Sequence, residues 1–302
     1  MKILMFGGRG WIGGQFEELI RTRFLEISLV QATSRPGSDQ DADAVSPSHV
    51  ISFIGRTHGA NINSIEYLEG GPDKLHENAR DNYYAPWLLA QLCQTLNVHM
   101  TYVGTGCLFQ YDDEHPIGGA GYKETEDANY RGNSYSVMKA FTDRAMRHYA
   151  QTALNVRIRL PINFANDKRN LVVKVVSYPR VFDIPNSVTI LPHVLPELVG
   201  LMRKRHTGTL NMTNPGPIRH SETLALYNEL VDKTKTWQVF DETHADAAKM
   251  LQSRANCTLD TTEFERLCPN VKPAIDGVKE AILRVAVADG KLDAKVLQEH
   301  GF

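Results

Sequence analysis

The chain has few cysteines, almost no net charge and no long apolar run. Its 302 residues include 4 cysteines, and 33 basic side chains nearly balance 35 acidic ones. This balance argues against a nucleic-acid-binding or membrane-surface protein. No apolar run approaches the roughly 18 residues that a membrane-spanning helix needs. We therefore expect a cytoplasmic protein without a signal peptide, whose cysteines are thiols and which binds no metal, because the cysteines lack metal-ligand spacing.

A glycine turn follows the short apolar run with which the chain opens. Gly7, Gly10 and Gly13 are three residues apart and lead into a stretch with a helical apolar pattern. Strand, glycine turn and helix in this order predict dinucleotide binding, since such glycines permit a tight turn, close approach of a pyrophosphate and close helix packing. A glycine-rich turn without a ligand is the alternative interpretation. Two further cofactor contacts are expected at the start of the helix, Trp11 and Ile12.

The end of the second expected strand, 26–32, indicates which dinucleotide binds. NAD enzymes carry an acidic residue here, which binds the ribose 2′-hydroxyl. This chain has Ser34 and Arg35 instead. A hydroxyl and a guanidinium fit a 2′-phosphate, so the sequence predicts NADPH. Arg35 as a solvated loop charge is the other interpretation.

Strand and helix patterns alternate through the first half of the chain. This alternation predicts an α/β fold, a Rossmann-like doubly wound parallel sheet with a smaller, mostly helical substrate-binding lobe. The expected strand ends Gly55, Gly104 and Pro161 should lie at one edge of the sheet, where ligands bind, and Pro161 is a predicted cofactor contact. The expected elements after the second strand are strands 49–54, 99–103, 155–160 and 209–214, and helices 74–96 and 134–151.

The domain boundaries are expected to be interleaved. We assign 1–165 to an NADP-binding Rossmann domain, to which the chain returns near 188–217. Residues 166–302 then form the substrate-binding lobe, whose chain is mostly short helices after His220.

Tyr135 and Lys139 are one helical turn apart, so their side chains project from the same face. A cation beside a phenol favours the phenolate, which makes the tyrosine a better proton donor and acceptor. Thr105 follows an expected strand, where its hydroxyl can orient a carbonyl. These three residues together predict carbonyl reduction: Tyr135 donates the proton, Lys139 holds the cofactor ribose, and Thr105 stabilises the oxygen.

With these motifs the chain resembles the extended short-chain dehydrogenase/reductases that act on nucleotide sugars. The glycine turn, Thr105 and the pair Tyr135–Lys139 match that family. The chain is most similar to the 3,5-epimerase/4-reductase portion of plant UDP-rhamnose synthases and to related viral enzymes. The similar stretches extend over nearly the whole chain, at 104–112, 115–118, 169–174, 183–187 and 213–216.

The resemblance implies further residues and a substrate. In that family a cysteine two residues after the catalytic hydroxyl, with a lysine in the second lobe, inverts carbons 3 and 5 beside the ketone. Cys107 and Lys174 stand at these positions, although a buried apolar cysteine and a solvated lysine are the ordinary interpretations. The implied reaction converts UDP-4-keto-6-deoxy-D-glucose to UDP-L-rhamnose, with a separate 4,6-dehydratase acting upstream. A homodimer is compatible with the sequence. The predicted substrate contacts are Asn163, Asn186 and Arg254.

Two other functions remain open from the sequence. One is a monofunctional dTDP- or UDP-4-dehydrorhamnose reductase, which needs an already epimerised substrate. The other is a regulatory subunit that binds NADPH without turnover. The intact Thr105, Tyr135 and Lys139 argue against the regulatory subunit.

Overall fold

The structure, a computed structural model, describes residues 1–34, 36, 46–59, 61–62, 64–240 and 253–302. Arg35, which we predicted to select NADPH, lies outside the described residues. The chain divides into two compact units, each built from three segments. Unit 1 comprises Met1–Leu108, Glu124–Arg157 and Leu195–Asn211. Unit 2 comprises Phe109–Lys123, Ile158–Val194 and Met212–Phe302.

Unit 1 is built on a six-stranded sheet with the order β2-β1-β3-β4-β5-β9. The pairs β1–β2, β1–β3, β3–β4 and β5–β9 are parallel. From β1 the chain adds β2 on one side and β3 on the other, so the sheet is doubly wound and the predicted fold class is confirmed. The strands are β1 (Lys2–Phe6), β2 (Ser28–Gln31), β3 (His49–Ser52), β4 (His99–Thr105), β5 (Ala153–Ile158) and β9 (Gly208–Asn211).

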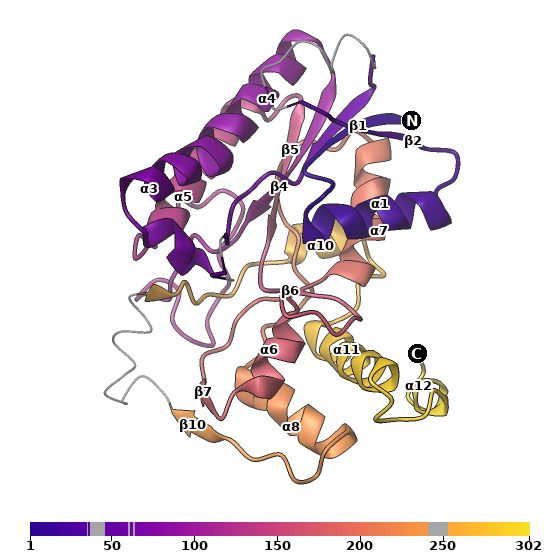
Figure 1. Ribbon diagram of the computed structural model, residues 1–302. Helices are drawn as coiled ribbons and strands as arrows, with labels where there is room; N and C mark the ends of the chain where they lie inside the picture. Colours follow the sequence, from indigo (N-terminus) through magenta and orange to yellow (C-terminus); the bar gives the residue numbers. More distant parts are fainter. Residues whose placement is uncertain (35, 37–45, 60, 63, 241–252) are drawn as a thin grey trace. The chain divides into compact units, whose positions relative to one another are not determined.

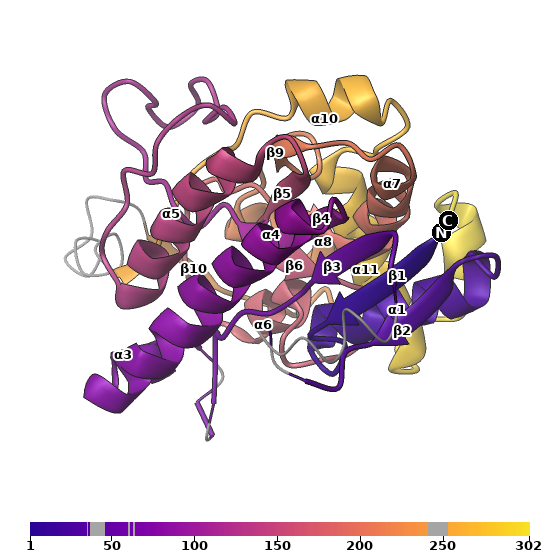
Figure 2. The same cartoon turned by 90° about the horizontal axis from the view of Figure 1, so that it is seen from above.

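Helices cover both faces of this sheet (Figures 1 and 2). Helix α1 (Trp11–Arg23) and the part of α7 (Leu191–Arg203) that belongs to unit 1 lie on one face. Helices α4 (Ala85–Thr95) and α5 (Ser134–Met146) lie on the other. Because β2 and β3 lie on opposite sides of β1, the strand order reverses between β1 and β3. Ligands bind in sheets of this kind at the carboxyl ends of the strands at such a point.

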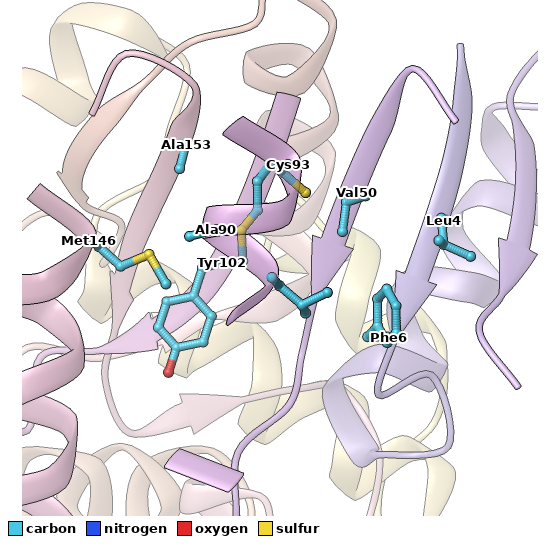
Figure 3. Packing of buried hydrophobic residues seen from close by; sticks show 10 residues of the cluster. Leu4, Phe6, Val50, Ala90, Cys93, Tyr102, Met146 and Ala153 are labelled. Atoms are coloured by element: carbon cyan, nitrogen blue, oxygen red, sulfur yellow. The ribbon is translucent and has the colours of Figure 1, made fainter. Parts of the chain in front are cut away.

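Apolar side chains from β1, β3, β4 and β5 pack under α4 and α5 (Figure 3). Full burial of one large apolar side chain contributes roughly 1.5–3 kcal/mol, so this cluster is a major source of stability in unit 1. Its buried members are Leu4, Phe6, Val50, Leu89, Ala90, Cys93, Met100, Tyr102, Met146 and Ala153.

The single helix predicted over 74–96 is wrong in detail, because a π turn interrupts it. Helix α3 (Pro72–Ala79) leads into the π turn η2 (Arg80–Tyr84), which leads into α4. Pro86 has no N–H to donate to the carbonyl of Asn82, four residues earlier. The Thr142 hydroxyl of α5 donates to that carbonyl instead, at 2.5 Å. The proline thus interrupts the hydrogen bonding of the helix, and Thr142 of α5 satisfies the Asn82 carbonyl that is left without a helical N–H donor.

The regular elements of unit 2 are mostly helices, together with two short parallel strand pairs, β6–β8 and β7–β10. Its core is formed by apolar side chains of β8, α6, α8 and α11. Helix α11 has 15 residues and is longer than the short helices expected after His220. No helix in the described part of the chain is long and apolar enough to cross a membrane. The elements are β6 (Pro161–Ile162), α6 (Leu171–Ser177), β7 (Arg180–Phe182), β8 (Thr189–Ile190), α8 (His220–Leu230), β10 (Gln238–Phe240), α10 (Thr262–Leu267), α11 (Ala274–Ala288) and α12 (Lys295–Glu299).

Candidate active site

The glycine turn lies between β1 and α1, at the point where the strand order reverses. Gly7 has a φ of +81°, which residues with a side chain rarely adopt. A Cβ on Gly13 would come within 2.4 Å of the Gly7 carbonyl oxygen, so α1 packs directly against the turn. Among the described residues, a Cβ on Gly10 would meet only that same oxygen, at 3.1 Å, so these residues leave the outer side of the turn open. Space beside a helix N-terminus suits a pyrophosphate, so these residues fit a dinucleotide.

The other predicted cofactor contacts in unit 1 lie around this turn. Trp11 and Ile12 are the first two residues of α1 and are half-buried. Ser34 lies three residues after the end of β2 and is also half-buried. Strand β2 is next to β1, so Ser34 follows the strand whose end contacts the adenosine ribose in folds of this kind.

Thr105, Cys107 and Tyr135 meet at the carboxyl end of β4. Thr105 is the last residue of β4, and its hydroxyl accepts a hydrogen bond from the Cys107 N–H at 3.1 Å. Tyr135 packs with half-buried Cys107 in one small cluster. Burial, and then the nearby Cys107 thiol, raise the Tyr135 pKa, whereas the nearby Thr105 hydroxyl lowers it. The phenol is therefore protonated at neutral pH and is a proton donor.

The first turn of α5 sets the position of Tyr135. The Asn133 side chain accepts the Ser136 N–H at 2.8 Å and so caps the helix. Tyr135 and Lys139 follow one turn apart, and both are buried. Lys139 Nζ lies 5.9 Å from the centre of the Tyr135 ring. Burial lowers the Lys139 pKa to about 7, against a smaller opposing effect of Asp81. The lysine can therefore change its charge near neutral pH.

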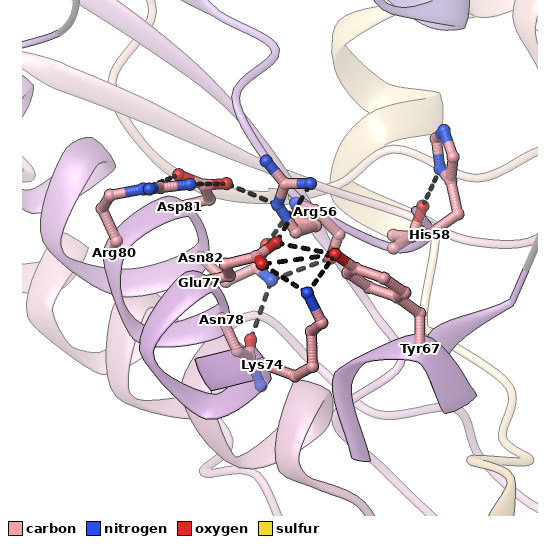
Figure 4. Close-up of polar contacts among 10 residues, drawn as sticks. Arg56, His58, Tyr67, Lys74, Glu77, Asn78, Arg80, Asp81 and Asn82 are labelled. Atoms are coloured by element: carbon pink, nitrogen blue, oxygen red, sulfur yellow. Dashed lines mark hydrogen bonds and ion pairs between the residues drawn. The ribbon is translucent and has the colours of Figure 1, made fainter. Parts of the chain in front are cut away.

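A polar network that was not predicted is shown in Figure 4. Its Asn82 side-chain oxygen lies near the Lys139 ammonium, because a Cβ on Gly55 would be 3.3 Å from the oxygen and 3.0 Å from Nζ. Asn82, in the π turn, accepts the Arg56 N–H at 2.9 Å and donates to the Arg56 carbonyl at 2.8 Å. Arg56 also pairs with Asp81 at 2.7 Å and with Glu77 at 3.3 Å. An asparagine in the middle of a predicted helix, followed four residues later by a proline, is the sequence signal that could have identified Asn82.

Lys174 and Arg254 are near one another in unit 2. Lys174 is a half-buried residue of α6, and Arg254 is exposed. Burial lowers the Lys174 pKa, Arg254 lowers it further, and Asp167 opposes both effects. A half-buried lysine with a lowered pKa loses its proton more readily, which suits a proton donor. Two neighbouring cations also suit an anionic ligand such as a diphosphate.

The remaining predicted residues of unit 2 are held by protein groups. Asn163 is buried, and its side-chain oxygen accepts the Ala165 N–H at 3.3 Å. Asn186 is buried and hydrogen-bonded to Arg159 and, at 3.0 Å, to Asn256. Pro161 is half-buried in the short strand β6.

The structure thus brings Thr105, Cys107, Tyr135 and Lys139 together in unit 1 and Lys174 and Arg254 together in unit 2. The unit 1 group can orient a carbonyl, give it a proton and offer a thiol. Within the described ranges, no cluster of three or more histidine, cysteine, aspartate or glutamate side chains could hold a metal.

Known proteins are similar to this chain over nearly its full length. The L780 protein of Acanthamoeba polyphaga mimivirus is 37% identical over 287 residues, which cover 94% of this chain and 99% of that protein. Its crystal structure, described as that of a UDP-rhamnose synthase, matches with a TM-score of 0.87. No family model matches the sequence.

Two more proteins bear on the family and the fold. An Arabidopsis thaliana bifunctional dTDP-4-dehydrorhamnose 3,5-epimerase/reductase is 31% identical over 295 residues, or 96% of this chain and 94% of that protein. A dTDP-4-dehydrorhamnose reductase from Bacillus anthracis, solved with NADP, is 15% identical, covers 93% of this chain and 98% of that one, and has a TM-score of 0.70. At that identity the second comparison shows the shared fold.

Proposed function

The chain belongs to the family of nucleotide-sugar 3,5-epimerase/4-reductases, and from this premise we propose that it converts UDP-4-keto-6-deoxy-D-glucose to UDP-L-rhamnose with NADPH. The observation that carries the proposal is the meeting of Thr105, Cys107, Tyr135 and Lys139 at the end of β4. Reduction of the ketone requires the hydroxyl of Thr105, the phenol of Tyr135 and the ammonium of Lys139. The thiol beside them has no part in reduction, and it supplies the group that epimerisation needs.

Cofactor binding is assigned to the glycine turn and the residues around it. The open side of Gly10 and the start of α1 would hold the pyrophosphate, and Ser34 with Arg35 would hold the 2′-phosphate. When bound, NADPH supplies the hydride that reduces carbon 4 of the sugar.

In the reduction, the Tyr135 hydroxyl gives its proton to the carbonyl oxygen as that oxygen gains charge. Thr105, whose hydroxyl lies near Tyr135, orients the same oxygen. The Lys139 ammonium would hold the cofactor ribose and stabilise the phenolate that Tyr135 leaves. Because the Lys139 pKa is about 7, this help weakens as the pH rises above neutral.

In the epimerisations, the Cys107 thiolate removes the proton from carbon 5 or carbon 3 and becomes a thiol. The electron pair of the broken C–H bond moves to the carbonyl, giving an enolate whose oxygen Tyr135 and Thr105 stabilise. The Lys174 ammonium returns a proton to the opposite face of the same carbon. Its lowered pKa supports this role, because it makes the ammonium a stronger acid. Proton exchange with solvent restores both groups, and no electrons are gained or lost overall.

Substrate binding is assigned to unit 2. Arg254, beside Lys174, is proposed to bind the diphosphate, and Asn163 and Asn186 to shape the sugar site. The substrate is a 4-keto-6-deoxy sugar, so a separate 4,6-dehydratase must supply it. We also propose a cytoplasmic location and a homodimer.

The test is to supply the purified protein with UDP-4-keto-6-deoxy-D-glucose and NADPH and to identify the product by mass spectrometry and NMR. We expect the product to be UDP-L-rhamnose, with one NADPH oxidised for each product molecule. A protein that consumes only pre-epimerised UDP-4-keto-L-rhamnose would be a reductase alone. A protein that binds NADPH and turns over neither ketone would contradict both activities.

A further inference from the structure

Tyr102 places a hydroxyl at the border between the apolar core of unit 1 and the catalytic lysine. Its ring belongs to the cluster under α4 and α5, and the residue is 1% exposed. Figure 3 shows the hydroxyl turned away from Ala90 and Cys93. The packing of the ring does not explain the oxygen, because a phenylalanine would fill nearly the same volume.

The partner of this hydroxyl is Lys139. The ammonium donates to the Tyr102 oxygen at 2.6 Å, and both side chains are buried. Burial raises the Tyr102 pKa well above its ordinary value, so the phenol stays neutral and offers its oxygen as an acceptor. A hydrogen bond to a charged donor in a buried place is among the stronger ones.

The Asp81 carboxylate of η2 also stabilises the Lys139 cation, because it raises the Lys139 pKa. Asp81 is itself paired with Arg56 and Arg80. A Cβ built on Gly55 would lie 3.0 Å from Nζ and 3.3 Å from the Asn82 side-chain oxygen, so both atoms face the same small space.

In the part of the chain that the structure describes, titratable groups on three elements lie near Lys139. Asp81 lies on η2, Tyr135 on α5 and Tyr102 on β4. Tyr102 is also affected by Tyr135 and by Asp143, both of which raise its pKa. Of these groups, Tyr102 is the one in direct hydrogen-bond contact with Nζ.

We propose that Tyr102 is a positioning residue for the reduction: its oxygen fixes one N–H of the Lys139 ammonium against β4 and leaves the other two for the bound cofactor. The inference rests on the proposed function, since it assumes that Lys139 holds the NADPH ribose. An ammonium has three N–H groups and no acceptor, so fixing one of them fixes the direction of the rest. The hydroxyl also supports the charged form of Lys139, which burial disfavours.

The test compares Tyr102→Phe with the matched control Tyr122→Phe. Tyr122 is likewise buried, at 3% exposure, and its hydroxyl donates to the Gln110 carbonyl at 2.6 Å. The first readout is the NADPH dissociation constant, measured by calorimetry. We expect Tyr102→Phe to weaken NADPH binding about 10-fold near pH 8, and less near pH 6, where Lys139 keeps its charge without help. Tyr122→Phe should leave the binding unchanged.

The second readout is the pH profile of kcat/KM for NADPH with pre-epimerised ketone. Its alkaline limb should move to lower pH by about one pH unit in Tyr102→Phe and stay in place in Tyr122→Phe. In a Lys139→Met background, Tyr102→Phe should have no further effect on NADPH binding, because the partner is gone.

Three outcomes overturn the inference. They are unchanged NADPH binding and pH profile in Tyr102→Phe, an equal loss in the Lys139→Met background, and a Tyr102→Phe protein that no longer folds. The failure of the proposed function gives a different result, because the wild-type protein itself would then turn over neither ketone, whether or not it binds NADPH.

Discussion

Replacing Lys139 by methionine should make the protein more stable and nearly inactive. Lys139 is buried, and burial lowers its pKa from 10.5 to about 7. The unfolded chain therefore binds this proton more tightly than the folded chain does, and the charge opposes folding at neutral pH. Methionine has a similar length and carries no charge, so the penalty disappears. Hydride reduction should fall at least about 100-fold, because Tyr135 loses the cation that supports its phenolate.

The size and the sign of the stability difference between wild type and Lys139→Met follow from proton linkage. Where the unfolded state binds more protons than the folded state, stability rises with pH. For Lys139 this is the window between pH about 7 and 10.5. The slope inside the window approaches 1.4 kcal/mol per pH unit, as an order of magnitude. Between about pH 6 and about pH 9 the free energy of unfolding of the wild-type protein should therefore rise by roughly 2–3 kcal/mol relative to that of the variant. Below pH 6 the difference between the two free energies should be constant.

The assay is urea denaturation of both proteins at several pH values in that range. Comparing the two free energies of unfolding cancels the titration of all other groups. Lys204→Met, at an exposed lysine of unit 1, controls for the change in net charge. A stability difference between wild type and Lys139→Met that does not change with pH, or a Lys139→Met variant less stable than wild type at neutral pH, would refute the reasoning.

Three other substitutions test separate parts of the account. Gly13→Ala puts a Cβ 2.4 Å from the Gly7 oxygen and should weaken NADPH binding at least about 10-fold by calorimetry. Gly14→Ala, whose Cβ would lie 3.7 Å from the Gly8 oxygen, should not weaken it, and equal NADPH affinities of the two variants would contradict the role of the glycine turn. Tyr135→Phe should lower the rate of reduction about 100-fold or more in stopped-flow assays while NADPH still binds, and a rate close to wild type would remove its role as the proton donor. Asp143→Asn, at a carboxylate bonded through both oxygens to a buried arginine, should lower the free energy of unfolding by about 3–5 kcal/mol in urea titrations, and a change below about 1 kcal/mol would contradict the buried pair.

Local patterns were sufficient to predict the first strand, its glycine turn and the helix that follows. In the same way, the four-residue step from Tyr135 to Lys139 predicts that both side chains lie on one face of a helix, and the structure places both on α5. Signals of this kind lie within a single element, where spacing alone fixes geometry.

Features that depend on contacts between elements escaped the sequence analysis. The π turn arises because Pro86 frees the Asn82 carbonyl, and it is stable because Thr142 of another helix donates to that carbonyl. In the sequence, Tyr102 is not distinguished from the apolar residues of its strand. The role of its hydroxyl follows only from the fold, in which α5 places Lys139 Nζ 2.6 Å from the Tyr102 oxygen. Helix α7 was not among the predicted elements, since Pro196 within it is a residue that usually ends helices.

The central claim is that one set of residues moves protons beside the ketone and then reduces it. The most direct measurement is turnover of UDP-4-keto-6-deoxy-D-glucose with NADPH in deuterated water, for the wild-type protein and for Cys107→Ser. The account predicts UDP-L-rhamnose with solvent deuterium at carbons 3 and 5 from the wild type. It predicts no deuterium at either carbon from Cys107→Ser, which should still reduce pre-epimerised ketone. Deuterium incorporation at the wild-type rate in Cys107→Ser would contradict the claim.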